Sequence, residues 1–367
     1  MVASYFLVPP PDRSDWAHLA CLIGGVVHRL APLGFAFGQP TAVSDDFVAG
    51  LLPARATRAR LYRARVRPAG VVARLPDVWL PPHLVVRALV LHGPYLYVGG
   101  SLERPHRAAR GCGATAGRLD LRDAQPRWEP LRLPGPAVPG KAVDDVLADD
   151  RALVVVDNAV FPKYLFVYPW SAADALPSAP HVVELPFSRV YEYVVKGQLS
   201  PGYLALRSTS AGMDGVGTYV SVLRRSDWAP VVVFAYEQSR EELWAEVRLL
   251  FPRDPPARSA CPFDLAMQEH TLVLACPGAL LHIDLRAFLI PTRPPNHARW
   301  DEAAPELAYP IVDLRDDAPV HGVRWEVLAP YERPDGIRFV APGQLLLTST
   351  GNSEPNAEQA WMRNALR

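Results

Sequence analysis

The chain of 367 residues is poor in cysteine and lacks the common catalytic motifs. Its four cysteines, Cys21, Cys112, Cys261 and Cys276, have neither CxxC spacing nor a nearby histidine pair, which argues against a zinc site. So few cysteines in so long a chain do not form a disulfide scaffold, so we expect free thiols in a reducing cytoplasm. No GxxxxGKS/T, GxSxG or HExxH motif occurs. The sequence therefore gives no positive sign of an enzyme.

Long apolar runs and an excess of one charge are also lacking. No apolar run reaches the length of about 18 residues that a membrane-spanning helix needs. The opening MVASYFLVPPPDR lacks the charged and apolar regions of a secretory signal. Because 38 Lys+Arg balance 38 Asp+Glu, the charge argues against a dedicated nucleic-acid binder and a polybasic membrane-surface protein. We therefore expect a cytoplasmic protein without membrane contact, for which nucleic acid is not the expected partner.

Lysine is scarce and proline is abundant. Lysine occurs at Lys141, Lys163 and Lys196 alone, among 38 basic residues, and we interpret the arginine excess as GC-rich bacterial coding. The 39 prolines predict many turns and few long helices, because proline is excluded from helix interiors and central strand positions. Apolar residues make up 49% of the chain, which is enough for a large core.

A hairpin pattern recurs along the sequence. Short apolar runs flank five expected turns, near Gly93, Asp150, Pro201, Glu269 and Gly343. Several of these hairpins are followed by an amphipathic strand and a more polar outer strand. Four strands in a unit of roughly 45 to 70 residues is the pattern of a β-propeller. We therefore predict an all-β fold, a β-propeller of about six four-stranded blades with five to seven possible.

Residues 55–350 resemble divergent bacterial β-propellers of the WD-repeat-like or quinoprotein-like kind. The resemblance is one of blade pattern. The three Asp/Trp pairs, at Asp15-Trp16, Asp227-Trp228 and Trp300-Asp301, have no fixed blade position, and the double glycine Gly99-Gly100 occurs in a single repeat. The resemblance therefore implies architecture and assigns no residue a role.

Three further segments are expected around and within the propeller. Residues 1–54 form an N-terminal strand–helix–strand appendage, whose helix begins after Ser14 and ends near Leu30. Its apolar stripe is Trp16, Leu19, Ile23, Val27 and Leu30. A second helix, SREELWAEVRLL, is inserted between blades, with Ser239 as its cap. Residues 351–367 form a polar C-terminal tail, and strands around 59–76 are expected to complete the last blade.

The leading functional hypothesis is a non-enzymatic propeller that binds a protein partner, as a scaffold or regulatory module in a cytoplasmic complex. Arginine and tryptophan are enriched at interfaces. The basic loop LERPHRAAR carries the candidate partner-binding residues Arg104, His106, Arg107 and Arg110, and the inserted helix carries Leu243 and Trp244. Further tryptophans, Trp79 among them, fall in expected loops or outer strands. Neither a cofactor nor a metal is expected in this hypothesis, and no residue is assigned as catalytic.

The alternative is a propeller hydrolase or lyase, using carboxylates at the central channel and calcium in one version. Its candidate carboxylates are Asp144, Asp145, Asp157, Glu192 and Asp214. The hydrolase or lyase hypothesis requires several of these carboxylates to converge on one pocket. Aspartate is also a favoured turn residue because its side chain caps backbone N–H groups, so pairs such as Asp149-Asp150 need no other role.

Overall fold

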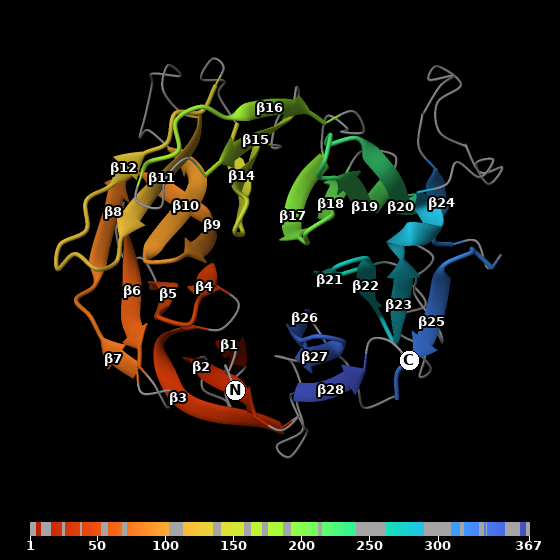
Figure 1. The fold of residues 1–367 in the computed structure, drawn as a ribbon, viewed down its shortest axis with the longest axis horizontal. Coiled ribbons are helices and arrows are strands. Elements are labelled where there is room, and N and C mark those ends of the chain that lie inside the picture. The colour runs from red at the N-terminus through yellow and green to blue at the C-terminus, as the bar shows by residue number, and fades with distance from the viewer. Residues whose placement is uncertain are drawn as a thin grey trace. The chain divides into compact units, whose positions relative to one another are not determined.

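Strands account for almost all regular structure in the described part of the chain. The computed structural model describes residues 5–8, 16–23, 26–36, 39–52, 58–67, 72–102, 113–134, 141–157, 163–170, 175–185, 192–211, 215–239, 262–289, 310–315, 319–329, 334, 336–348 and 360–364. The chain divides into two compact units, Met1–Val190 and Tyr191–Arg367. The sheets of both units are drawn in Figure 1.

The first unit contains four antiparallel sheets, here called blades A to D. Blade A contains β1 (Tyr5–Val8), β2 (Trp16–Ile23) and β3 (Val26–Ala36). Blade B contains β4 (Thr41–Val43), β5 (Phe47–Leu52), β6 (Arg58–Val66), β7 (Val72–Arg74) and β8 (Val78–Pro82). Blade C contains β9 (Leu84–His92), β10 (Tyr95–Leu102), β11 (Gly113–Asp120) and β12 (Glu129–Pro130). Blade D contains β13 (Val143–Ala148), β14 (Ala152–Asp157), β15 (Tyr164–Pro169) and β16 (His181–Glu184).

The second unit contains three sheets, blades E to G. Blade E contains β17 (Glu192–Leu199), β18 (Tyr203–Ala211), β19 (Gly215–Arg224), β20 (Pro230–Ser239) and β24 (Ile311–Asp313). Blade F contains β21 (Asp264–Gln268), β22 (Thr271–Cys276), β23 (Ala279–Asp284) and β25 (Val323–Val327), with the 3-10 helix η2 (Leu285–Phe288) after β23. Blade G contains β26 (Gly336–Ala341), β27 (Gln344–Thr348) and β28 (Ala360–Asn364). Strand β24 joins blade E in parallel with β20, although it lies between β23 and β25 in sequence.

The prediction of an all-β propeller is confirmed, and the blades number seven, which lies within the predicted range of five to seven. The preferred count of six is one too low because β1, β2 and β3, expected as an appendage, form a sheet of their own. Strands 59–76 do not complete the last blade as expected. They fall in β6 and β7, and β6 pairs with β5, β7 and β8.

All five expected hairpin turns are confirmed, and each joins the first and second strands of its blade. Gly93, Gly343 and Glu269 have positive φ angles of 54°, 66° and 51°. Tight turns of this kind favour residues that tolerate the left-handed region, glycine first among them. The hairpins were predictable because their turns depend on local chemistry.

The predicted N-terminal helix is wrong, since its residues form β2 and the first part of β3. Ala17 and Leu19 are fully buried against blade B, and the adjacent Ala20 is fully buried as well. The pairing of β2 with β3 shifts register between Trp16 and His18 and again between Leu19 and Ala20. Such bulges break the two-residue alternation of a strand, so the apolar spacing imitates that of a helix.

The other expected segments are described only in part. Ser239, the expected helix cap, is the last residue of β20, and the rest of the inserted helix, 240–250, lies outside the described residues. In the expected tail, β28 pairs with β27 from Thr348↔Ala360 to Gln344↔Asn364. Across the expected boundary at residue 54, β5 pairs with β6.

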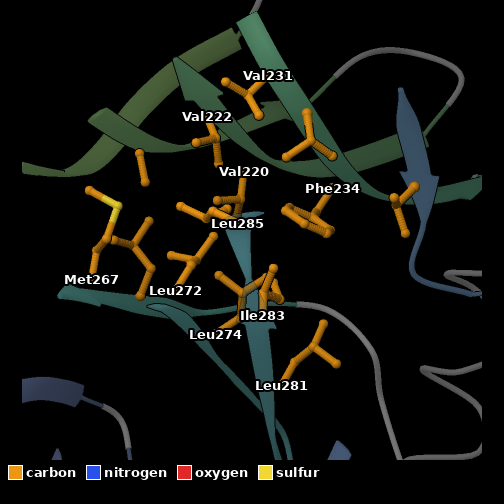
Figure 2. Packing of buried hydrophobic residues seen from close by; sticks show 14 of the residues in the cluster. Val220, Val222, Val231, Phe234, Met267, Leu272, Leu274, Leu281, Ile283 and Leu285 are labelled. Atoms are coloured by element: carbon orange, nitrogen blue, oxygen red, sulfur yellow. The ribbon is translucent and has the colours of Figure 1, made fainter. Parts of the chain in front are cut away.

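Neighbouring blades within a unit pack face to face through buried apolar side chains. Between blades E and F, Val220, Val222 and Phe234 meet Leu272 and Leu274 (Figure 2). Comparable cores join blade A to B, B to C, C to D, and F to G. Within each unit, a blade is therefore covered by the blades beside it, which is how stacked repeats bury faces that a lone blade would expose.

Replacing Gly100 with alanine should lower the free energy of unfolding by about 2 to 3 kcal/mol. A Cβ atom at Gly100 would collide with the backbone oxygen of Val85 on the paired strand β9. The control is Gly202→Ala in the β17–β18 turn, where a Cβ atom would have no neighbour within 4 Å. We expect this control to change stability by less than about 0.5 kcal/mol. Urea unfolding tests both, and equal losses would contradict the close strand approach.

Candidate functional site

The candidate residues from the sequence fall at one end of their own blades. We call the loop end of a blade the end where its first strand begins, its second strand ends and its third strand begins. Arg104, His106, Arg107 and Arg110 fall between β10 and β11, and Asp214 falls between β18 and β19. These five residues lie outside the described residues, as do Leu243 and Trp244, which follow β20. Connections between strands commonly carry function, which is why this end is of interest.

The described carboxylates of the enzymatic alternative belong mainly to blade D. Asp144 and Asp145 lie in β13, and Asp157 ends β14, where it pairs with Val143. Glu192 is the first residue of β17, in the second unit. The structure thus brings Asp144, Asp145 and Asp157 to one end of one sheet. Glu192 belongs to the other unit, and Asp214 lies outside the described residues.

Asp144 is held in an ion pair that joins blades C and D. It is the bulge residue of β13, because the register passes from Val143↔Asp157 to Asp145↔Val156. Arg87 occupies the bulge of β9, and its Nη1 donates to Asp144 Oδ1 over 2.8 Å. The Asp144 side chain is fully shielded from solvent (0% exposed). The bulges in β13 and β9 direct Asp144 and Arg87 toward each other, and the resulting ion pair links blades C and D.

Asp157 forms a second, more deeply buried pair. Lys141 Nζ donates to Asp157 Oδ2 over 2.7 Å and lies 4.8 Å from the ring centroid of Tyr164. Among the described residues, no group donates to the buried Asp157 Oδ1. Lys163, directly before Tyr164, is also fully buried. The loop end of blade D therefore gathers two buried lysines and Asp157 at three consecutive strand ends, in addition to the buried Asp144.

Burial raises the pKa of Asp157, and Lys141 opposes this through its hydrogen bond and charge. An acid whose pKa is raised by folding binds its proton more tightly in the folded state than in the unfolded state. Its contribution to stability is therefore fully present below the unfolded pKa of about 3.9. That contribution is lost as the pH rises through the folded pKa.

The consequence is testable with Asp157→Asn, which cannot titrate. The free energy of unfolding of the wild-type chain, taken relative to that of Asp157→Asn, should fall between pH 4 and pH 7. Urea unfolding at several pH values measures this difference, and other titrating groups cancel from it. A difference that rises with pH would show that Lys141 dominates over burial.

The second unit contains a related arrangement around Asp264 in blade F. Lys196 Nζ, from blade E, donates to Asp264 Oδ1 over 2.6 Å. The backbone N–H of Ile337, from blade G, donates to Asp264 Oδ2 over 2.8 Å. One carboxylate thus connects three blades. Lys141 pairs with Asp157 within blade D, and Lys196 pairs with Asp264 between blades E and F. Two of the three lysines of the chain are therefore paired with buried aspartates.

Blade B carries a different kind of charged surface, which we call the arginine–tryptophan face: Arg58, Arg60, Arg74 and Trp79, with Asp77 between them. Trp79 is 52% exposed, and the guanidinium carbon of Arg60 lies 5.7 Å from its ring centroid. Arg74 Nη2 lies 3.2 Å from Asp77 Oδ1. Among the tryptophans whose side chains the structure describes, Trp79 alone is exposed.

The other tryptophans with described side chains are half-buried. Trp170 stacks on His92 at 4.4 Å between ring centroids, and Trp128 packs against Gly117. Sequence reasoning included Trp79 among the interface candidates. It missed the three arginines around Trp79, because β6, β7 and β8 are brought together only by pairing.

The described residues hold no group of three or more His, Cys, Asp or Glu side chains that suits a metal ion. In the same residues, no helix has the length and apolar character needed to cross a membrane. Cys21 and Cys276 are buried free thiols, as expected for two of the four cysteines.

Comparison with known proteins gives structural neighbours and no sequence family. No protein-family model and no curated protein matches the chain. A protein from Lactobacillus plantarum matches with a TM-score of 0.49 and 11% identity, over 98% of this chain and 91% of that one.

Two further neighbours match less of the chain. TolB from Acinetobacter baumannii matches with a TM-score of 0.41 and 11% identity, over 77% of this chain and 61% of TolB. A candidate 6-phosphogluconolactonase from Bacteroides uniformis matches with a TM-score of 0.41 and 10% identity, over 77% of this chain and 92% of that one. At these identities the likeness concerns the propeller fold and transfers no activity.

Proposed function

We propose that this chain is a non-enzymatic, protein-binding propeller that acts as a scaffold or regulatory module in a cytoplasmic complex. The observation that carries the proposal is the arginine–tryptophan face, where Trp79 stands exposed beside Arg58, Arg60 and Arg74. Tryptophan and arginine are the residue types that most often dominate binding energy at protein interfaces. The loop-end residues Arg104, His106, Arg107 and Arg110, with Leu243 and Trp244, are proposed as further partner contacts.

The state of the described carboxylates also supports a binding role. Asp144 is shielded and paired with Arg87, and Asp157 is buried and paired with Lys141. A carboxylate that acts as an acid, a base or a calcium ligand must reach its substrate or ion. These two are instead committed to contacts within the protein, which favours a structural role for them over the hydrolase alternative.

The proposal is tested by measuring catalysis and partner capture on the same purified full-length chain. We expect no turnover of lactone, ester or glycoside substrates, with calcium or with a chelator. We expect a discrete protein from the native host to be retained by the wild-type chain and lost on Arg104→Glu/Arg107→Glu or on Trp79→Ala. Substrate turnover that a chelator abolishes, without any retained partner, would overturn the proposal.

A further inference from the structure

The arginine–tryptophan face is formed by alternation on two paired strands. On β6, Ala59 and Leu61 point into the core shared with blade C, so Arg58 and Arg60 point to the opposite side. On β8, Val78 and Leu80 enter the same core, and Trp79 between them points with the arginines. Since Arg60 pairs with Trp79 in the strand register, the charge and the aromatic ring lie next to each other.

The arginine side chains are held in place while their ends stay available. Arg58 Nε donates to the backbone oxygen of Leu80 over 2.6 Å, and Arg60 Nε lies 3.6 Å from Asp77 Oδ2. In the described part of the chain, no group accepts a hydrogen bond from the Nη atoms of Arg58 or Arg60. Asp77 supplies the carboxylate of the arginine–tryptophan face, so this face carries three guanidinium groups and one carboxylate.

We propose that this face binds an extended acidic segment of a partner protein, an inference that rests on the proposed function and names the chemistry of its partner. A guanidinium group with free Nη atoms matches a carboxylate through two parallel hydrogen bonds. The exposed ring of Trp79 offers an apolar anchor between such pairs. The excess of arginine over aspartate on this face is the charge that a segment rich in Asp and Glu would complement.

An extended segment also suits the sheet geometry. Strands β7 and β8 both pair with β6, at successive places along it. Among the described strands, none pairs with β7 or β8 other than β6. A segment lying along this outer edge would pass Arg74, Trp79 and Arg58 in turn, because all three lie on β7, β8 or the adjoining strand. This is the reason for proposing a strand-like occupant rather than a single ion.

The test uses fluorescence anisotropy with the full chain and a labelled peptide of alternating glutamate and serine. We expect binding that weakens with salt, because exposed charge pairs are screened. Trp79→Ala and Arg60→Glu should each weaken binding about tenfold. The matched control is Arg65→Glu, which makes the same charge change at an exposed position on the opposite side of β6. That control should change binding by less than about twofold, and unchanged thermal unfolding midpoints confirm that the variants fold.

The inference is overturned if the peptide does not bind, if the same peptide with glutamine in place of glutamate binds equally well, or if Arg65→Glu weakens binding as much as Arg60→Glu does. A single-stranded oligonucleotide that binds more tightly through Trp79 and Arg60 would also overturn it, in favour of nucleic acid. If the host partner is still retained by Trp79→Ala and by Arg60→Glu but is lost on Arg104→Glu/Arg107→Glu, this inference fails while the proposed protein-binding function stands.

Discussion

Replacing Lys141 with methionine is expected to lower the free energy of unfolding by about 3 to 5 kcal/mol. Lys141 and Asp157 have side chains that are 7% and 5% exposed and are joined over 2.7 Å. Removal of the ammonium group leaves the Asp157 carboxylate buried without its cation, which is the costly way to break a buried pair. Urea unfolding at neutral pH measures the loss.

The double variant Lys141→Met/Asp157→Leu separates pairing from packing. With both charges replaced by apolar groups of similar size, we expect stability within about 1 kcal/mol of the wild type. The coupling energy between the two positions should therefore be large. If the double variant is as unstable as Lys141→Met, Lys141 does not stabilise the fold through its ion pair with Asp157. The explanation of blade D by a buried ion pair is then wrong.

Replacing Arg63 with methionine should also cost about 3 to 5 kcal/mol. Arg63 is 1% exposed. It donates to the backbone oxygens of Pro76, Leu121, Asp123 and Ala124 over distances of 2.7 to 3.1 Å. Three of these oxygens belong to the β11–β12 region of blade C, so one side chain from β6 joins blades B and C. Without it, four carbonyl groups lose a charged donor.

The matched control is Arg65→Met, two residues along the same strand. Arg65 is exposed, with its guanidinium carbon 5.5 Å from the ring centroid of Phe47. A single exposed cation–π contact contributes about 0.5 to 1 kcal/mol, so Arg65→Met should stay within that range. Equal losses at Arg63 and Arg65 in urea unfolding would show that the four carbonyl contacts of Arg63 do not stabilise the blade interface.

Features that depend on neighbouring residues were predictable from the sequence. The turns at Gly93 and Gly343 combine a positive φ with a glycine, and apolar strands flank both. Repetition of such hairpins identified the propeller, because stacked units of one design bury each other.

Features that depend on irregular strands were not predictable. The apolar spacing from Trp16 to Leu30 was interpreted as a helix because two bulges disturb the alternation of β2. Strand β24 joins blade E although its neighbours in sequence belong to blade F. No local pattern in IVD indicates that choice, since three residues carry too little periodicity.

The charge pairs lie beyond sequence reasoning for the same reason. Arg87 and Asp144 are 57 positions apart, and each side chain is directed by a bulge in its own strand. The sequence identified Asp144 and Asp157 as notable carboxylates but offered no partners for them. Their partners are supplied by the packing of blades and of strand ends.

We propose that the exposed charge of this chain binds a protein while its buried charge holds the blades together. The most direct test places a photo-crosslinking benzoylphenylalanine at Trp79 in the full chain, in the native host, with the same residue at Val327 as control. Val327 is 58% exposed on blade F and lies outside the arginine–tryptophan face. The account predicts one dominant adduct from Trp79, with a crosslinked partner peptide rich in Asp and Glu, and no matching adduct from Val327. An adduct of equal yield at both positions, or a partner peptide without acidic residues, would contradict it.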